Sequence, residues 1–229
     1  MALLATAILL AATAVHSTES QSADDPRTSA QNASGQQSPA HQSSLQQGSK
    51  AKKTSTFTAD RAPAKIPDIK VMDQDGKPRH FYSDLVRGKV VVINFIYTTC
   101  TTICPPLGAT FGKLQKNLGE RLGKDVFLIS VSVDPATDTP ERLRAWGAQF
   151  KARPGWTLVT GEKAELTGLL RVLGADAASP ENHSPMVLIV NDKAALWKRV
   201  YGLGSTAALM HNVEEMMAAS SGNAGERPQ

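Results

Sequence analysis

The stretch "KVVVINFIYTTCTTICPP" (residues 89–106) joins a nearly continuous apolar segment to both cysteines of the chain. Residues 89–97 are mostly β-branched or aromatic, and polar and apolar positions do not alternate. A strand of this kind is buried on both faces, as in a sheet that helices cover on both sides. Cys100 and Cys104 follow directly, before two prolines. The stretch therefore predicts a central strand that leads two thiols to the start of a helix.

Four further segments predict other strands of the same sheet. Residues 125–133 ("DVFLISVSV") and 186–190 ("MVLIV") have the same apolar character and predict two more buried strands. Residues 69–81 predict a hairpin that turns at residues 73–76. "LWKRVYG" (residues 196–202) predicts a strand that follows a turn at Asn191 and Asp192.

Helices are predicted wherever apolar side chains recur every three or four residues. Thr139 is the expected N-cap of the second helix, with Pro140 at its first position, and Gly174 is expected to close the third. The four apolar stripes are Leu107, Phe111, Leu114, Leu118 and Leu122; Leu143, Trp146 and Phe150; Leu166, Leu169, Leu170 and Leu173; and Leu209, Val213, Met216 and Met217.

The order of these elements is hairpin, β, α, β, α, β, α, β, β, α. Strands that alternate with helices indicate an α/β sheet rich in parallel pairs, and the adjacent strands near the end add an antiparallel part. This order predicts a thioredoxin-like α/β fold with an N-terminal β-hairpin and one inserted β-α unit.

The chain has 229 residues, enough for one domain with flanking segments. Residues 66–217 contain the predicted elements and form the expected thioredoxin-like domain. Residues 16–65 are rich in Ser, Gln, Ala and Thr, which predicts a disordered linker, because such a segment buries too little apolar surface to offset its ordering entropy. Residues 218–229 predict a flexible tail.

The N-terminal segment predicts export from the cytoplasm. Residues 2–15 ("ALLATAILLAATAV") are apolar and uncharged, but the run is shorter than the ~20 residues that a membrane-spanning helix needs. It fits the apolar part of a secretory signal, or part of a longer anchor, although no Lys or Arg precedes it. The formal net charge is only +4, and the one lysine cluster (residues 50–53) lies in low-complexity sequence, so no nucleic-acid partner is expected.

The two cysteines are better explained by chemistry than by a structural disulfide. A bridge across so short a loop removes little entropy from the unfolded chain and stabilises little. Reactive groups and ligands gather at the carboxyl ends of strands in open α/β sheets. We expect Cys104 at a helix N-terminus, where the partial positive charge favours a thiolate, and Cys100 on the exposed side of the loop.

The spacing of the pair leaves more than one chemistry open. C-x-x-C at this position is typical of a dithiol oxidoreductase, and this chain has one residue more. Two thiols with this spacing are still able to close a disulfide. As thiolates they suit Cu(I) or zinc, but a closed zinc site usually takes four protein ligands. Copper with a third protein ligand is the favoured metal hypothesis.

His183 is the candidate third ligand among the five histidines. It lies in "SPENHSPMVLIV", directly before a buried strand, in a loop expected opposite the cysteine loop. The alternative is a hydrogen-bonded structural histidine. Met186 is a candidate axial thioether, although a methionine at a strand start more often belongs to the core. The other histidines lie at the signal boundary, in the linker, after the hairpin turn and off the stripe of the last helix: His16, His41, His80 and His211.

Three blocks of sequence, "NFIYTTCTTICP", "SVSVDPATDTPERL" and "NHSPMVLIVND…WKRVYG", together resemble the Sco/SenC family of copper-binding assembly proteins. The resemblance covers residues 66–217. It implies a thioredoxin-like protein, soluble or anchored to the inner membrane, that faces the periplasm or the mitochondrial intermembrane space. It also implies one Cu(I) or Cu(II) ion, bound through Cys100, Cys104 and His183.

The resemblance further implies a role in building the binuclear copper centre of cytochrome c oxidase, by delivering copper or by reducing the cysteines that receive it. The implied partners are subunit II of the oxidase, or its copper-centre domain, and other copper chaperones. A copper metallochaperone is not an enzyme, whereas a thiol-disulfide oxidoreductase is, and a redox or copper sensor would use the same residues. A peroxidase would need an activating arginine, and the sequence assigns none.

Some positions depart from the family or have two interpretations. The family commonly has Pro and then an acidic residue after the first cysteine, where this chain has Thr101 and Thr102. Asp134, at the end of a predicted strand, is expected near the cysteine loop, where it tunes the thiols or meets a partner. Asp138 and Thr139 suit turn and helix-cap chemistry at least as well.

Overall fold

The computed structural model describes residues 60–61 and 65–222, and a mixed sheet of eight strands runs through this part of the chain. The strand order is β1-β8-β7-β4-β5-β6-β2-β3. Pairs β4–β5 and β5–β6 are parallel, and every other neighbouring pair is antiparallel. The strands are β1 (Asp60–Arg61), β2 (Lys70–Asp73), β3 (Pro78–His80), β4 (Val90–Ile96), β5 (Val126–Ser132), β6 (Trp156–Gly161), β7 (Met186–Asn191) and β8 (Leu196–Tyr201).

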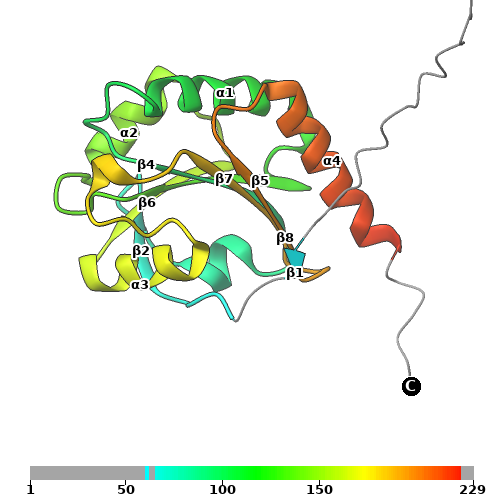
Figure 1. Cartoon of the computed structure of the whole chain (residues 1–229), viewed down its shortest axis with the longest axis horizontal. Coiled ribbons are helices and arrows are strands. Elements are labelled where there is room, and N and C mark those ends of the chain that lie inside the picture. The colour runs from blue at the N-terminus through cyan, green and yellow to red at the C-terminus, as the bar shows by residue number, and fades with distance from the viewer. Residues whose placement is uncertain (1–59, 62–64, 223–229) are drawn as a thin grey trace, which may run out of the picture. The chain divides into compact units, whose positions relative to one another are not determined.

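Strand β4 lies in the middle of the sheet and is buried along its whole length. Val90, Val92 and Ile96 belong to one core cluster, and Val91, Ile93 and Phe95 belong to the cluster on the other face. Helices α1, α2 and α4 cover the first face, and α3 and a π-helix, η1, cover the second (Figure 1). Their bounds are α1 (Cys104–Leu118), α2 (Pro140–Gln149), α3 (Lys163–Leu173), α4 (Thr206–Gly222) and η1 (Phe81–Val86).

The predicted thioredoxin-like fold class is confirmed. The N-terminal hairpin is β2 and β3, and the predicted alternation of strands and helices follows in order. Helix α2 and strand β6 form the additional unit between β5 and α3. Thr139 caps α2 by accepting a hydrogen bond from the Arg142 N–H (3.3 Å), and Gly174 closes α3 in the left-handed conformation (φ 76°).

Local structure differs from the sequence expectation at two places. Helix α1 ends at Leu118, because Gly119 takes φ 55° and ψ −125°, which most side chains avoid. Leu122, predicted as the last member of that helical stripe, follows a 3₁₀ turn (Gly119–Arg121) and still packs against the core. The π-helix η1 after the hairpin was not expected.

The domain limits of 66–217 remain a prediction. Strand β1 falls within the predicted linker, where it pairs with β8, and α4 continues to Gly222. The predicted signal or anchor, most of the linker with His16 and His41, and the last seven residues of the tail (223–229) lie outside the described residues. No helix in the described part is long and apolar enough to cross a membrane.

Candidate metal centre

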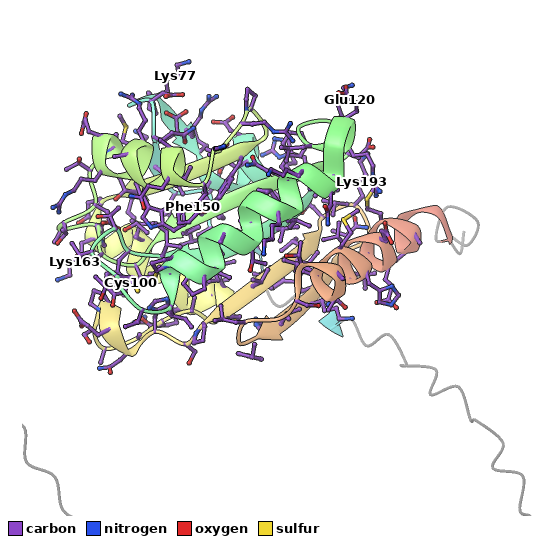
Figure 2. All side chains as sticks on the ribbon, turned by 90° about the horizontal axis from the view of Figure 1, so that it is seen from above. Lys77, Cys100, Glu120, Phe150, Lys163 and Lys193 are labelled. Carbon is purple, nitrogen blue, oxygen red and sulfur yellow. The ribbon has the colours of Figure 1, made fainter. Side chains whose placement is uncertain are left out.

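The cysteine loop, the β5–α2 loop and the loop before β7 meet at one end of the sheet. Strands β4 and β5 run parallel and end together, and β7 starts beside the end of β4 because these two strands are antiparallel. Cys100 lies beside the first turn of α1, at the opposite end of that helix from Glu120 (Figure 2). This is the sheet end at which ligands are expected in open α/β folds.

Both cysteines are free thiols, and both are buried. Cys104 is the first residue of α1 and is fully buried, and its backbone N–H donates a hydrogen bond to the Cys100 sulfur (3.3 Å). Cys100 is only 6% exposed, so the expectation that the loop places it on the exposed side is wrong. The Thr102 hydroxyl lies 3.9 Å from the same sulfur. The loop folds back on itself, so that the Cys104 N–H and the Thr102 hydroxyl both lie close to the Cys100 sulfur.

The two thiols have opposite acidities. Burial raises the pKa of Cys100, but hydrogen bonds with Cys104, the Thr102 backbone and the Tyr97 side chain outweigh it and lower this pKa to about 7. Burial, and then the hydrogen bond to Cys100, raise the pKa of Cys104 to about 12. The prediction that the helix N-terminus makes Cys104 the thiolate is therefore wrong. Cys100 is therefore the more acidic thiol of the pair.

His183 ends a 3₁₀ turn (Pro180–Asn182) just before β7, and its side chain is 6% exposed. Its Nδ1 lies 2.6 Å from the carbonyl oxygen of Pro180. Because a carbonyl only accepts, the proton sits on Nδ1 and Nε2 carries a free lone pair. Nε2 is buried without a hydrogen-bond partner. A buried basic nitrogen in this state suits a metal ligand.

Tyr97, which the sequence analysis did not single out, contacts both sides of the site. Its ring packs against the His183 ring in a T-shaped arrangement, with centroids 5.7 Å apart and planes at 81°. Its backbone carbonyl accepts a hydrogen bond from the Cys100 N–H (3.2 Å). The two thiols and the imidazole are thus linked through Tyr97, but no three His, Cys, Asp or Glu side chains of the described residues gather closely enough to hold a metal.

Asp138 is the carboxylate that anchors the cysteine loop. It is 1% exposed and accepts hydrogen bonds from the Thr98 N–H (2.9 Å) and hydroxyl (2.6 Å) and from the Ser132 hydroxyl (2.6 Å). It thereby ties the end of β5 to the start of the cysteine loop. From the sequence, Asp138 was expected to serve ordinary turn and helix-cap chemistry, because it directly precedes Thr139, the predicted N-cap of a helix.

Asp134 lies four residues before Asp138, in the same loop. It lines a cavity of about 140 Å³ together with Ser179 and Pro180, which belong to the loop that carries His183. Its backbone N–H, rather than its carboxylate, bonds the Ser132 hydroxyl (3.0 Å). Tuning of the thiols by Asp134, or contact with a partner, remains a prediction.

The remaining candidates have ordinary surroundings. Met186 is buried in the core cluster on the face of the sheet opposite the cysteines, which favours the core interpretation. His80 is exposed at the end of the hairpin, and His211 is exposed on α4, with its Nε2 3.3 Å from Glu215. Thr101 and Thr102 are both exposed.

A buried dithiol after the central strand, with a histidine nearby whose Nε2 has no partner, defines a thioredoxin-like protein suited to thiol or soft-metal chemistry. The family comparison makes this specific. The SCO1/SenC family model matches residues 58–218, so the chain belongs to the SCO1/SenC family.

Individual relatives agree with this assignment. The "SCO1 protein homolog" of Bacillus subtilis is 41% identical over 91 residues, which is 39% of this chain and 45% of that relative. BsSco, described as a member of the Sco family of cytochrome c oxidase assembly proteins with a disulfide switch, has a solved structure 28% identical to this chain. Its TM-score is 0.58, with 70% of this chain and 98% of BsSco covered.

The fold also matches yeast Sco1 solved with copper bound, at a TM-score of 0.60 and 17% identity, covering 72% of this chain and 96% of Sco1. At this identity the match shows the fold alone. The chain spans about half the length of the curated relatives it matches, 45% and 52% for the first two.

Proposed function

We propose that this protein is a copper metallochaperone that binds one copper ion through Cys100, Cys104 and His183 for assembly of the binuclear copper centre of cytochrome c oxidase. Two thiolates and one imidazole are a soft donor set that suits Cu(I). The proposal includes export, from the apolar segment at residues 2–15, and subunit II of the oxidase or its copper-centre domain as the acceptor. The named role of BsSco in cytochrome c oxidase assembly supports this direction.

The observation that carries the proposal is the buried, unpaired Nε2 of His183. A polar nitrogen left unpaired in the interior is unfavourable by about 1–3 kcal/mol, so an unpaired histidine at this position calls for a function that offsets this energy. Coordination of a metal gives Nε2 a partner, and the Pro180 carbonyl already holds the opposite nitrogen in the matching tautomer. A shift of the loop that carries His183 would complete the set.

Copper binding on these residues is coupled to proton release. Cys104, whose pKa is raised to about 12, gives up its proton when it becomes a thiolate ligand, whereas Cys100 with a pKa of about 7 is largely ionised above neutral pH. Affinity for copper therefore falls as the pH falls. Delivery proceeds by stepwise exchange of these ligands for the thiols of the acceptor.

An anaerobic Cu(I) titration against a competing chelator tests the ligand set. We expect one copper ion per wild-type chain, loss of tight binding in Cys100→Ser and Cys104→Ser, and weaker binding in His183→Ala. His211→Ala is the matched control, because His211 is exposed and bonded to Glu215, and it should bind like the wild type. Wild-type affinity in His183→Ala, or no binding by the reduced wild-type protein, refutes the proposal.

A second candidate function is a thiol-disulfide oxidoreductase that reduces the acceptor cysteines. The observation that favours it is the unequal acidity of Cys100 and Cys104, as expected for an attacking and a resolving thiol. The Cys100 thiolate would attack the acceptor disulfide and release one thiolate. Cys104 would then lose its proton and attack Cys100, which releases the second. Turnover of a disulfide substrate that is unchanged in His183→Ala would favour this role, and a redox or copper sensor would use the same residues.

A further inference from the structure

We propose that a pocket at the sheet end opposite the thiols binds a phosphate group that carries an apolar substituent. The pocket has a volume of about 370 Å³, and Arg79, Lys89 and Lys124 all line it. No aspartate or glutamate of the described residues is among its lining side chains. Its volume lies in the range of small-molecule sites, about 300–1,000 Å³. The pocket shares no residue with the proposed copper site and does not depend on it.

The topology of the sheet brings these three cations together from separate segments. Lys89 directly precedes β4, and Lys124 lies two residues before β5. Because β4 and β5 are parallel, both lysines lie at the same end of the sheet. Arg79 belongs to β3, and η1 joins that strand to the segment that contains Lys89. Cys100 follows the opposite end of β4, so the pocket and the thiols are at different ends of the strand.

Lys89 is the residue that makes this pocket a candidate site. Its Nζ lies over the Phe127 ring, 4.8 Å from the centroid, and donates a hydrogen bond to the Asp84 carbonyl oxygen. Burial lowers the pKa of this ammonium; the Asp84 carboxylate acts in the opposite direction, and the Arg79 guanidinium lowers the pKa further. Lys89 forms no ion pair with any carboxylate of the described residues. A half-buried ammonium has lost part of its hydration, and an anion in the pocket would replace that hydration.

The other two cations keep donors that an anion could use. Arg79 bonds Asp73 through Nε (3.1 Å), and its Nη groups have no further hydrogen-bond partner among the residues that the structure describes. Lys124 forms an ion pair with Glu120 (3.2 Å), at the far end of α1 from the cysteines (Figure 2). Their side chains are 69% and 96% exposed, and such a pair contributes little. Both cations could therefore donate to an anion without the loss of a buried ion pair.

The charges and the walls of the pocket indicate the class of ligand. Three cations match a phosphate monoester, which carries about −1.5 to −2 charges at pH 7, better than a single carboxylate. Leu85, Phe127 and Pro154 give the pocket apolar walls. Such walls strengthen the attraction for an anion and suit an alkyl or aryl group attached to the phosphate. This chemistry occurs in soluble organic phosphates and in phospholipid headgroups.

Isothermal titration calorimetry of the full chain with phenyl phosphate tests the pocket. We expect one site with a dissociation constant below about 1 mM in low salt, and weaker binding as salt is added. Inorganic phosphate should bind more weakly than phenyl phosphate, because it has no apolar group to contact the walls. In ¹H–¹⁵N spectra, the amides of Lys89, Lys124 and Phe127 should shift with the same dissociation constant.

Two variants test whether the cations hold the phosphate. Lys89→Met keeps an unbranched side chain over Phe127 and removes the charge, so the dissociation constant should rise about tenfold or more. Lys124→Gln changes an exposed side chain that folding does not require, and the dissociation constant should rise about two- to fivefold. Lys113→Gln is the matched control, because Lys113 is exposed on α1 and does not line the pocket, and this variant should bind like the wild type.

Sedimentation with lipid vesicles distinguishes the two sources of phosphate. Binding to phosphatidylglycerol vesicles but not to phosphatidylcholine vesicles, reduced in Lys89→Met, would support the pocket and identify a lipid headgroup. Binding of phenyl phosphate without binding to vesicles would support the pocket and identify a soluble phosphate. The absence of saturable binding to either probe, or binding that is unchanged in both Lys89→Met and Lys124→Gln, overturns the inference.

Discussion

The unequal acidity of the two thiols predicts that Cys100 is modified far faster than Cys104 in the reduced, metal-free protein. At pH 7 a thiol with a pKa of about 7 is about half ionised, and one with a pKa of about 12 is ionised in about one molecule in 10⁵. The thiolate populations therefore differ by about 5 × 10⁴. The exposed fractions of 6% and 0% add to the difference.

The higher basicity of the Cys104 thiolate offsets part of this ratio, because a less basic thiolate, such as that of Cys100, is a weaker nucleophile. With a Brønsted coefficient of about 0.4–0.5, five pKa units return a factor of about 10²–10²·⁵. The net expectation is that iodoacetamide modifies Cys100 roughly 10²–10³-fold faster than Cys104 at pH 7. A shift of one pKa unit in either thiol changes this figure several-fold without reversing the order.

Initial rates between pH 6 and pH 9, with the modified residue located by peptide fragmentation, give both profiles. The Cys100 rate should rise through pH 7 and level off above pH 8. The Cys104 rate should rise about tenfold per pH unit over the whole range, because its pKa of about 12 is never approached. Equal rates, or a Cys100 midpoint near the ordinary value of 9.0, would show that the hydrogen bonds around Cys100 do not outweigh its burial.

Three further predictions concern the loop anchor, the helix packing and the oxidised state. Asp138→Ala should lower the free energy of unfolding by about 2–4 kcal/mol in urea titrations, because the substitution leaves three buried donors without an acceptor. The control Asp134→Ala should change the free energy of unfolding by less than about 0.5 kcal/mol. Gly108→Ala should destabilise by about 1–3 kcal/mol, since the added Cβ would lie 2.5 Å from the Phe150 ring, whereas Gly168→Ala, with open space, should stabilise by about 0.5–1 kcal/mol. Oxidation of the two thiols to a disulfide should abolish copper uptake measured by metal analysis, and dithiothreitol should restore it; copper retained by the oxidised protein contradicts the ligand set.

The elements that the sequence predicts well are those that local pattern determines. A nearly continuous apolar run placed β4 in the centre of the sheet, and the Thr139–Pro140 pair placed the start of α2. Such features depend on neighbours within one or two turns of the chain. The same rule explains the error at Leu122, where apolar spacing continued past a glycine whose backbone ends the helix.

The site was harder to predict, because its contacts join residues far apart in the sequence. Asp138 bonds Thr98 from forty positions away, and Tyr97 meets His183 only because β4 and β7 are antiparallel neighbours. A tyrosine at the end of an apolar strand gives no sign of which side chain its ring will contact. Histidine position and cysteine spacing gave the candidate ligands, but not the residue between them.

The acidity of Cys104 shows how two effects compete at one atom. A helix N-terminus favours an anion by about 0.3–1 kcal/mol near the surface, whereas full burial of an ionised group opposes it by more. Cys104 is fully buried, and its thiol donates to its neighbour, so burial wins and the thiolate forms at Cys100. Helix position alone therefore predicted the thiolate at Cys104 instead of Cys100.

The choice between copper delivery and thiol reduction depends on His183 more than on the cysteines. Two thiols of unequal acidity are compatible with either role. Copper delivery and thiol reduction both use one readily ionised sulfur and a second sulfur that loses its proton later. A dithiol reductase gains nothing from a buried imidazole whose Nε2 has no partner, and such a nitrogen is unfavourable by about 1–3 kcal/mol. That arrangement is favourable only where a ligand takes the lone pair, and so the unpaired nitrogen makes a metal-binding function the stronger interpretation of this site.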